Sequence, residues 1–166
     1  MLTNSRLAYQ SHDHKRCVNA ALQRAQTLCN DNQARLTPIR EAVLRTIWDS
    51  HRPLGAYDIV DKMTLNANSG KRIQAPTIYR ALEFLLEQGL IHRIASLNAY
   101  IGCPFPGKNH SDFFLICRAC GSAAECCAEQ LDNMVSHTAE RTGFQVEAQT
   151  IEIIGLCPEC QQNSDK

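Results

Sequence analysis

Apolar residues recur at helical spacing in four stretches of about the first ninety residues. These stretches cover about residues 15–30, 38–48, 56–63 and 76–88. In each stretch the apolar positions lie three or four residues apart, which places them on one face of a helix that can be buried. The pattern therefore predicts four amphipathic helices joined by polar segments.

Residues at the ends of these stretches support the assignment. Thr37 precedes Pro38, and a threonine can accept hydrogen bonds from free helix amides while proline suits the first helical position. Gly89 is placed to end the fourth helix. Two short β-prone runs follow at 90–94 and 99–101, which predicts a hairpin. Three helices followed by a hairpin are typical of a winged helix-turn-helix.

The rest of the chain has a different pattern. Residues 103–111, with two prolines and one glycine, predict a hinge. A strand is expected at 113–116, a helix at about 127–142 and a long strand at 144–154. The apolar phase of the last strand changes near Thr150, and a bulge there or burial on both faces would explain the change.

These elements predict an α+β protein with two domains. Residues 1–102 form a winged-helix domain, in which residues 1–14 are expected to be a frayed polar tail. Residues 103–112 form the hinge, and residues 113–166 form a small α/β domain.

Charge is distributed unevenly between these parts. The chain of 166 residues is 44% hydrophobic and 20% charged, as in folded proteins, and its formal net charge is zero. However, residues 1–102 carry 13 Lys and Arg against 8 Asp and Glu, whereas residues 103–166 carry 4 against 9. We expect any polyanion to meet the basic part, although an unevenly charged solvated surface is the alternative.

Nothing in the pattern predicts membrane insertion or secretion. The longest apolar run, Phe113 to Cys117, is far shorter than the ~18 residues of a membrane span. The first 17 residues contain no apolar segment of the kind found in signal peptides. We therefore expect a cytoplasmic protein.

Cysteine is abundant, with nine residues, and the odd number argues against a disulfide framework. The clearest motif is a pair of C-x-x-C sequences, formed by Cys117 with Cys120 and by Cys157 with Cys160. Two such pairs can supply four thiolates to one tetrahedral zinc ion that stabilises the fold. A redox-active pair is the alternative, but it is expected at a helix start in a βαβ pattern rather than twice at strand ends.

A second group of candidate metal ligands is more dispersed. His92 lies in the first strand of the hairpin, Cys103 follows the second, His110 lies in the hinge and Glu125 follows the first C-x-x-C. Together they are a four-coordinate set compatible with zinc, and the thiolate favours zinc over harder ions such as manganese. Taken singly, a wing surface residue, a packed cysteine and two solvated residues are the simpler interpretations.

Candidate DNA contacts cluster around the fourth helix. Thr77, Tyr79 and Arg80 lie in its first two turns, where a recognition helix meets phosphates and base edges of the major groove. Lys71 and Arg72 precede the helix and are placed for backbone contacts. A solvated helix with ordinary charges is the alternative.

Other histidines and cysteines point to no defined role. Packing, surface or tail positions are expected for this set, which comprises His12, His14, Cys17, Cys29, His51, Cys126, Cys127 and His137. Metal binding by His12, His14 and Cys17 is the alternative to a tail position for these three residues.

Several motifs together resemble the ferric uptake regulator family of metal-dependent repressors. They are APTIYRALEFLLEQGLIHRI, RLTPIREAVL, GAYDIVDKM and the two C-x-x-C pairs, and the similarity covers about residues 15–160. Within the family the chain is most similar to the zinc uptake regulator branch, because His92, Cys103, His110 and Glu125 fall on that branch's sensing positions. Iron-sensing branches have a histidine-rich stretch where residues 108–112 contain one histidine.

The resemblance implies a homodimeric repressor of zinc-uptake genes that binds operator DNA. It implies two zinc ions per monomer, one structural and one regulatory, and a dimerisation role for residues 113–166. It also implies that Tyr57, Tyr79 and Arg80 contact DNA.

Two alternatives remain open at this point. One is a regulator of the same family that senses iron or manganese. The other is a zinc hydrolase or deaminase, but a deaminase needs an H-x-E motif, which this sequence lacks, and a hydrolase needs a metal with an open position. We therefore expect no enzyme activity.

Overall fold

The computed structural model describes residues 9, 13–66, 73–108, 110 and 112–164. The chain divides into two compact units. One comprises His12–Lys108, and the other comprises Asn109–Lys166 together with Met1–Ser11. We call them the helical unit and the sheet unit and describe each separately.

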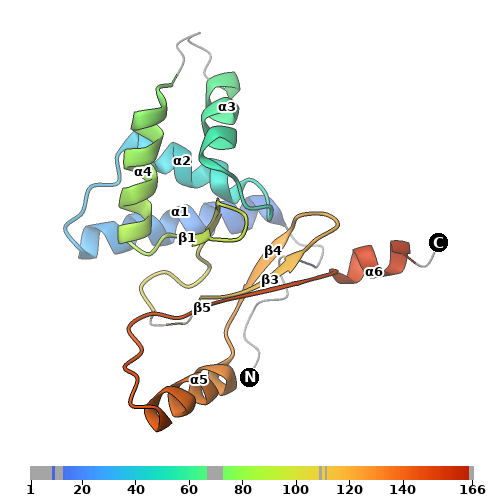
Figure 1. Cartoon of the computed structure of the whole chain (residues 1–166). Coiled ribbons are helices and arrows are strands. Elements are labelled where there is room, and N and C mark those ends of the chain that lie inside the picture. Colours follow the sequence, from blue (N-terminus) through green and yellow to red (C-terminus); the bar gives the residue numbers. More distant parts are fainter. Residues whose placement is uncertain (1–8, 10–12, 67–72, 109, 111, 165–166) are drawn as a thin grey trace. The chain divides into compact units, whose positions relative to one another are not determined.

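The helical unit is built around four helices, as the apolar pattern predicts. They are α1 (His14–Asp31), α2 (Pro38–Trp48), α3 (Ala56–Asn66) and α4 (Ala75–Glu87). Helix α2 packs against each of the other three (Figure 1). Each helix buries its apolar stripe, and each contains at least one residue with no exposed surface, such as Ala25, Val43, Ile59 and Ile78. Burial of these stripes is the main stabilising contribution to the unit.

Helix ends agree with the sequence in part. Helix α2 begins at Pro38 as expected, but the Thr37 side chain makes no capping hydrogen bond. Helix α4 ends before Gly89, whose φ of 63° is the left-handed conformation that glycine adopts readily. The Asp13 carboxylate accepts a hydrogen bond from the Arg16 N–H (3.3 Å) and so caps the first helix. Asp13 and His14, expected to belong to a frayed tail, are therefore part of the start of α1.

The predicted hairpin is confirmed. Strands β1 (Ile91–Ile94) and β2 (Ala99–Gly102) pair antiparallel, with His92 opposite Ile101. Leu54 adds an isolated bridge to Tyr100, through backbone bonds of 3.0 and 2.8 Å. The hairpin is therefore tied to the loop between α2 and α3 as well as to its own partner strand.

The sheet unit contains a three-stranded sheet in the order β4-β3-β5. The central strand β3 (Asp112–Cys117) pairs antiparallel with β4 (Ala123–Cys126) and parallel with β5 (Thr150–Gly155). Helix α5 (Glu129–Arg141) connects β4 to β5, and α6 (Pro158–Ser164) follows β5. Because β3 and β5 are parallel neighbours, their carboxyl ends lie at the same edge of the sheet (Figure 1).

The prediction of one long strand at 144–154 is wrong, because β5 begins only at Thr150. Both explanations of the phase change are also wrong, since no bulged strand crosses Thr150 and β5 is partly exposed rather than buried on both faces. Phe144, Val146 and Ala148 alternate for another reason: together with residues of α5 they line a groove of about 500 Å³. Strand β4 and helix α6 were not predicted, since their segments are too short to show a period.

No helix in the described part of the chain is both long and apolar enough to cross a membrane.

Candidate metal centres and nucleic-acid surface

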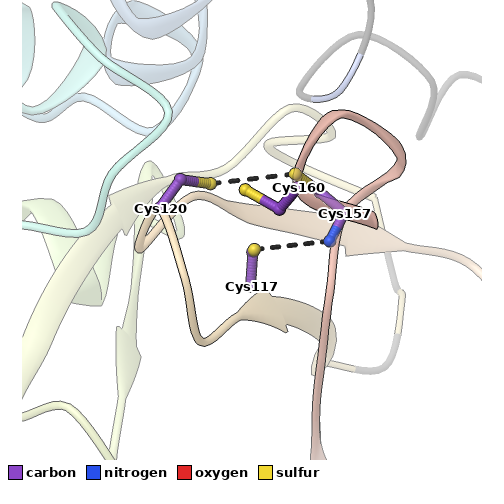
Figure 2. Close-up of side chains that lie close together, drawn as sticks. All are labelled: Cys117, Cys120, Cys157 and Cys160. Carbon is purple, nitrogen blue, oxygen red and sulfur yellow. Dashed lines mark hydrogen bonds between the residues drawn. The ribbon is translucent and has the colours of Figure 1, made fainter. Parts of the chain in front are cut away.

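The two C-x-x-C pairs meet at one edge of the sheet. Cys117 is the last residue of β3, and its register partner on β5 is Gly155, two residues before Cys157. Cys160 lies in the first turn of α6, and Cys120 lies in the turn after β3. All four sulfur atoms lie within 4.8 Å of one another (Figure 2). The parallel pairing of β3 with β5 thus brings together cysteines that are 40 residues apart.

Backbone geometry shapes the first pair into a tight turn. The Gly121 N–H donates to the Cys117 carbonyl (2.9 Å), and Gly121 has a φ of 74°. The N–H of Cys157 donates to Sγ of Cys117 at 3.3 Å (Figure 2). Hydrogen bonds of this kind stabilise a thiolate, which is the form of cysteine that binds metal.

The protonation of the four thiols differs according to their hydrogen bonds. The backbone N–H of Cys120, followed by that of Cys157, lowers the pKa of Cys117 to about 6. Hydrogen bonds from the side chain and N–H of Ser122 lower the pKa of Cys120. The hydrogen bond to the Cys157 side chain, assisted by burial, raises the pKa of Cys160 to about 12. The cluster therefore gives up its first proton readily and resists losing all four.

The donor set fits a zinc ion. A bound divalent cation favours the thiolate form of cysteine and offsets the mutual repulsion of four thiolates. The separation of 3.8 Å between Sγ of Cys120 and Sγ of Cys157 also fits. Two sulfur atoms bound to one tetrahedral zinc at ~2.3 Å are roughly 3.8 Å apart.

Two of the four dispersed candidate ligands lie in the helical unit. His92 is half-buried on β1, and Cys103 follows β2 with 2% of its surface exposed. The N–H of Cys103 donates to the Leu90 carbonyl, and Sγ of Cys103 accepts a hydrogen bond from the Phe105 N–H at 3.4 Å. The ligand atoms of His92 and Cys103 lie within 4.8 Å of each other. The hairpin thus presents an imidazole and an oriented sulfur side by side.

The other two ligands lie in the sheet unit and contact each other. Nε2 of His110 is 2.7 Å from Oε1 of Glu125, and their side chains are 12% and 1% exposed. Glu125 lies on β4, opposite Phe114 of the central strand. The interpretation of His110 and Glu125 as solvated residues is therefore wrong. A buried carboxylate in contact with an imidazole brings together two groups of the kinds that bind zinc.

The position of Cys103 depends on its neighbour Gly102. A Cβ atom at Gly102 would lie 2.3 Å from both Cε2 and Nε1 of the Trp48 indole, so only glycine fits there. Trp48 is the last residue of α2. The helix and the end of the hairpin are therefore in direct contact beside the candidate ligand.

We expect Gly102→Ala to lower the free energy of unfolding of the helical unit by about 1–3 kcal/mol, because the indole or the hairpin must move. Urea denaturation followed by tryptophan fluorescence measures this. Gly155→Ala is the matched control, since a Cβ there meets nothing within 4 Å. Equal stability of the two variants would contradict the close contact.

The residues predicted to contact DNA lie on exposed surfaces of the helical unit. Thr77, Tyr79 and Arg80 are exposed on α4, while Ile78 between them is buried in the core. Tyr57, in the first turn of α3, is 72% exposed. Lys71 and Arg72 lie outside the described residues. The packing of α4 therefore directs its polar face outward.

The remaining candidates occupy ordinary positions. The rings of His14 and His51 are in edge-to-face contact, with centroids 4.9 Å apart. Cys29 and Cys126 are buried, and Cys17 and Cys127 are half-buried. His137 is exposed on α5, and His12 lies outside the described residues.

Comparison with known proteins gives consistent results. The model of the ferric uptake regulator family matches residues 31–154. The zinc uptake regulation protein of Escherichia coli (strain K12) is 36% identical over 147 residues, which are 88% of this chain and 84% of that protein.

Two solved structures are similar over nearly their whole length. One is a zinc uptake regulator complexed with zinc and DNA, with a TM-score of 0.82 and 33% identity over 90% of this chain and 98% of that one. The other is holo XcZur, with a TM-score of 0.76 and 38% identity over 87% and 99%. By its sequence and its fold, the chain belongs to the ferric uptake regulator family.

Proposed function

We propose that this protein is a zinc-responsive, DNA-binding transcriptional repressor, and that its targets are zinc-uptake genes. The observation that carries the proposal is the split set of ligands. His92 and Cys103 are held together in the helical unit, and His110 and Glu125 are held together in the sheet unit. The names of the similar proteins, zinc uptake regulation protein and a zinc uptake regulator complexed with zinc and DNA, support the choice of zinc and DNA.

The proposal assigns different roles to the two ligand sets. Cys117, Cys120, Cys157 and Cys160 hold a structural zinc, which closes the edge of the sheet where β3 and β5 end. His92, Cys103, His110 and Glu125 hold a regulatory zinc, which gives two zinc ions per monomer. A bound zinc ion supplies positive charge and tetrahedral coordination at each set.

Zinc-dependent control of DNA binding follows from the fact that the ligands of the second set come from both units. Cys103 and Glu125 both carry negative charge in the ligand form, so the two units gain from approaching each other only when a cation is present. The chain passes from one unit to the other after Lys108, within the predicted hinge of residues 103–112, and this segment would absorb the change in orientation. A differential affinity of this kind typically shifts DNA binding by about 5–150-fold, which corresponds to ~1–3 kcal/mol.

An apolar surface on the sheet unit supports a homodimer. Helix α5 buries none of its described residues, and Met134 and Phe144 are 62% and 68% exposed. Ile153 and Ile154 are also exposed on β5, which is an edge strand. Exposed apolar surface beside an open strand edge is typical of an interface, and a second copy of the chain would cover it.

Dimerisation would set the distance between the two copies of the DNA-binding helix α4. Two-fold symmetry places two copies of α4 so that each can enter a major groove, and successive grooves are roughly 34–36 Å apart. Tyr57, Thr77, Tyr79 and Arg80 are the exposed residues that would contact the DNA, together with Lys71 and Arg72.

We expect Arg80→Ala to weaken binding to the operator by about 1–3 kcal/mol, with a smaller effect on random DNA, because a guanidinium on a recognition helix can read a guanine edge. Fluorescence anisotropy with both DNAs at one salt concentration measures this. Arg24→Ala, an exposed position on α1, is the control. An equal loss on both DNAs would show that Arg80 contacts only phosphate.

The whole proposal is tested by zinc stoichiometry combined with a mobility-shift titration against buffered free zinc. We expect one tightly held zinc per monomer at low free zinc and a second as operator binding appears. Operator binding that responds to iron or manganese but not to zinc would instead indicate a sensor of another metal. Binding that persists after removal of the weaker ion would refute metal control.

A further inference from the structure

Tyr9 contacts the sheet unit close to the four cysteines, although it lies more than 100 residues before them. It is half-buried, and its hydroxyl donates to the Leu115 carbonyl on β3 at 2.5 Å. The same hydroxyl is 3.5 Å from the Ser122 carbonyl. Tyr9 therefore contacts both the strand that leads into the first cysteine pair and Ser122, two residues after this pair.

The carbonyl of Ser122 has a structural role of its own. It accepts the N–H of Cys117 at 2.8 Å, which closes the turn containing Cys117 and Cys120. Ser122 also donates hydrogen bonds to Cys120 through its side chain and its N–H. A contact that restrains Ser122 therefore restrains both cysteines of the first pair.

The surroundings of Tyr9 keep it a neutral hydrogen-bond donor. Burial raises the pKa of the Tyr9 phenol well above its ordinary value, and negative charge at Cys117 and Cys157 raises it further. A neutral phenol in this position keeps its one O–H to donate to the Leu115 carbonyl, with the Ser122 carbonyl at longer range, and adds no negative charge beside the thiolates.

We propose that Tyr9 is a positioning residue of the four-cysteine site, which holds the Cys117–Cys120 turn closed and slows the loss of its metal ion. The inference rests on the structural zinc of the proposed function. It changes the interpretation of the start of the chain, because Tyr9 lies in a segment that the sequence analysis expected to fray.

The physical argument is one of local opening. A zinc ion leaves a four-thiolate site only after one or two ligands detach, and Cys117 and Cys120 detach when the turn between β3 and β4 opens. The Tyr9 hydroxyl adds one hydrogen bond that must break in that opening. A net contribution of about 0.5–1.5 kcal/mol corresponds to a two- to tenfold change in the rate of release.

The test compares wild type, Tyr9→Phe and Tyr9→Ala as full-length, zinc-loaded proteins. Zinc transfer to an excess of a chromogenic chelator is followed over time, and global unfolding is followed by circular dichroism after a jump into urea. We expect release to be two- to tenfold faster in Tyr9→Phe, which loses only the hydroxyl, and faster still in Tyr9→Ala. Tyr100→Phe, a half-buried tyrosine of the helical unit, should release zinc at the wild-type rate.

The unfolding rate distinguishes an effect of Tyr9 on the cysteine turn from an effect on the stability of the whole protein. If Tyr9 positions the turn, release accelerates more than global unfolding does. Release that is unchanged in both variants, or that accelerates only in step with unfolding, overturns the inference while the structural zinc of the wild type remains. A wild-type protein that holds no tight zinc refutes the structural zinc itself and the inference with it.

Discussion

Cys117→Ser is expected to abolish the tightly held zinc and to unfold the sheet unit, while the helical unit stays folded. The apparent binding free energy of structural zinc in small domains is about 10–16 kcal/mol, and it acts as folding free energy. The sheet unit has little to replace it, because α5 contributes no buried residue and the described core is a few side chains such as Phe114 and Ile116. A serine at this position removes one proposed ligand, a thiol whose pKa is lowered to about 6 by the backbone N–H groups of Cys120 and Cys157.

Hydrogen exchange with mass spectrometry, together with zinc analysis, measures the effect on each unit separately. We expect amide protection to disappear from β3 and β5 and to persist in α2 and α4. Cys127→Ser is the control, because Cys127 is half-buried and lies outside both ligand sets. Unchanged protection of β3 in Cys117→Ser would show that the four-cysteine centre does not hold the sheet together.

Cys103→Ser is expected to give a folded protein that keeps one zinc per monomer and loses the response of operator binding to zinc. Sγ of Cys103 accepts a hydrogen bond from the Phe105 N–H and lies beside His92, so serine fits the position but gives a far weaker zinc ligand. The loss in operator affinity at saturating zinc should lie between about 5- and 150-fold.

Anisotropy titrations with operator DNA at several buffered zinc concentrations measure this response. Cys17→Ser, a half-buried cysteine of α1, should behave as wild type. Full zinc-dependent affinity in Cys103→Ser would refute the regulatory role of this ligand. Loss of the tightly held zinc as well would show that the two sites are not independent.

Helices were the part of the fold that the sequence predicted best. Their apolar stripes are long enough to show a period of 3.6, and Pro38 and Gly89 mark two of the ends. Strand boundaries were predicted less well. Residues 144–149 alternate as a strand would, but Phe144, Val146 and Ala148 line a groove with α5, and the strand that pairs with β3 begins only at Thr150. A period of two reports that a segment has one apolar side, and does not report whether that side pairs in a sheet or lines a groove.

The candidate sites were also predicted only in part from the sequence. Spacing alone identified the two C-x-x-C pairs, because two cysteines separated by two residues can reach one ion within a single turn. Spacing could not show that His110 and Glu125 are buried against each other, since His110 lies in the predicted hinge and Glu125 lies on a four-residue strand. No sequence signal pointed to Tyr9, whose partners are backbone carbonyls that carry no sequence information.

The order of residues by itself determined the helices, the hairpin, the ligand types and the family. The helices and the hairpin depend on contacts between residues close in sequence, and the ligand types and the family are recognised from short sequence motifs. Tertiary structure alone decided which distant groups meet: the parallel pairing of β3 with β5 that joins the cysteine pairs, the indole of Trp48 against Gly102, and the hydroxyl of Tyr9 beside the turn. The physical reason is that such contacts form when packing closes long loops, and the sequence spacing of the partners does not record that closure.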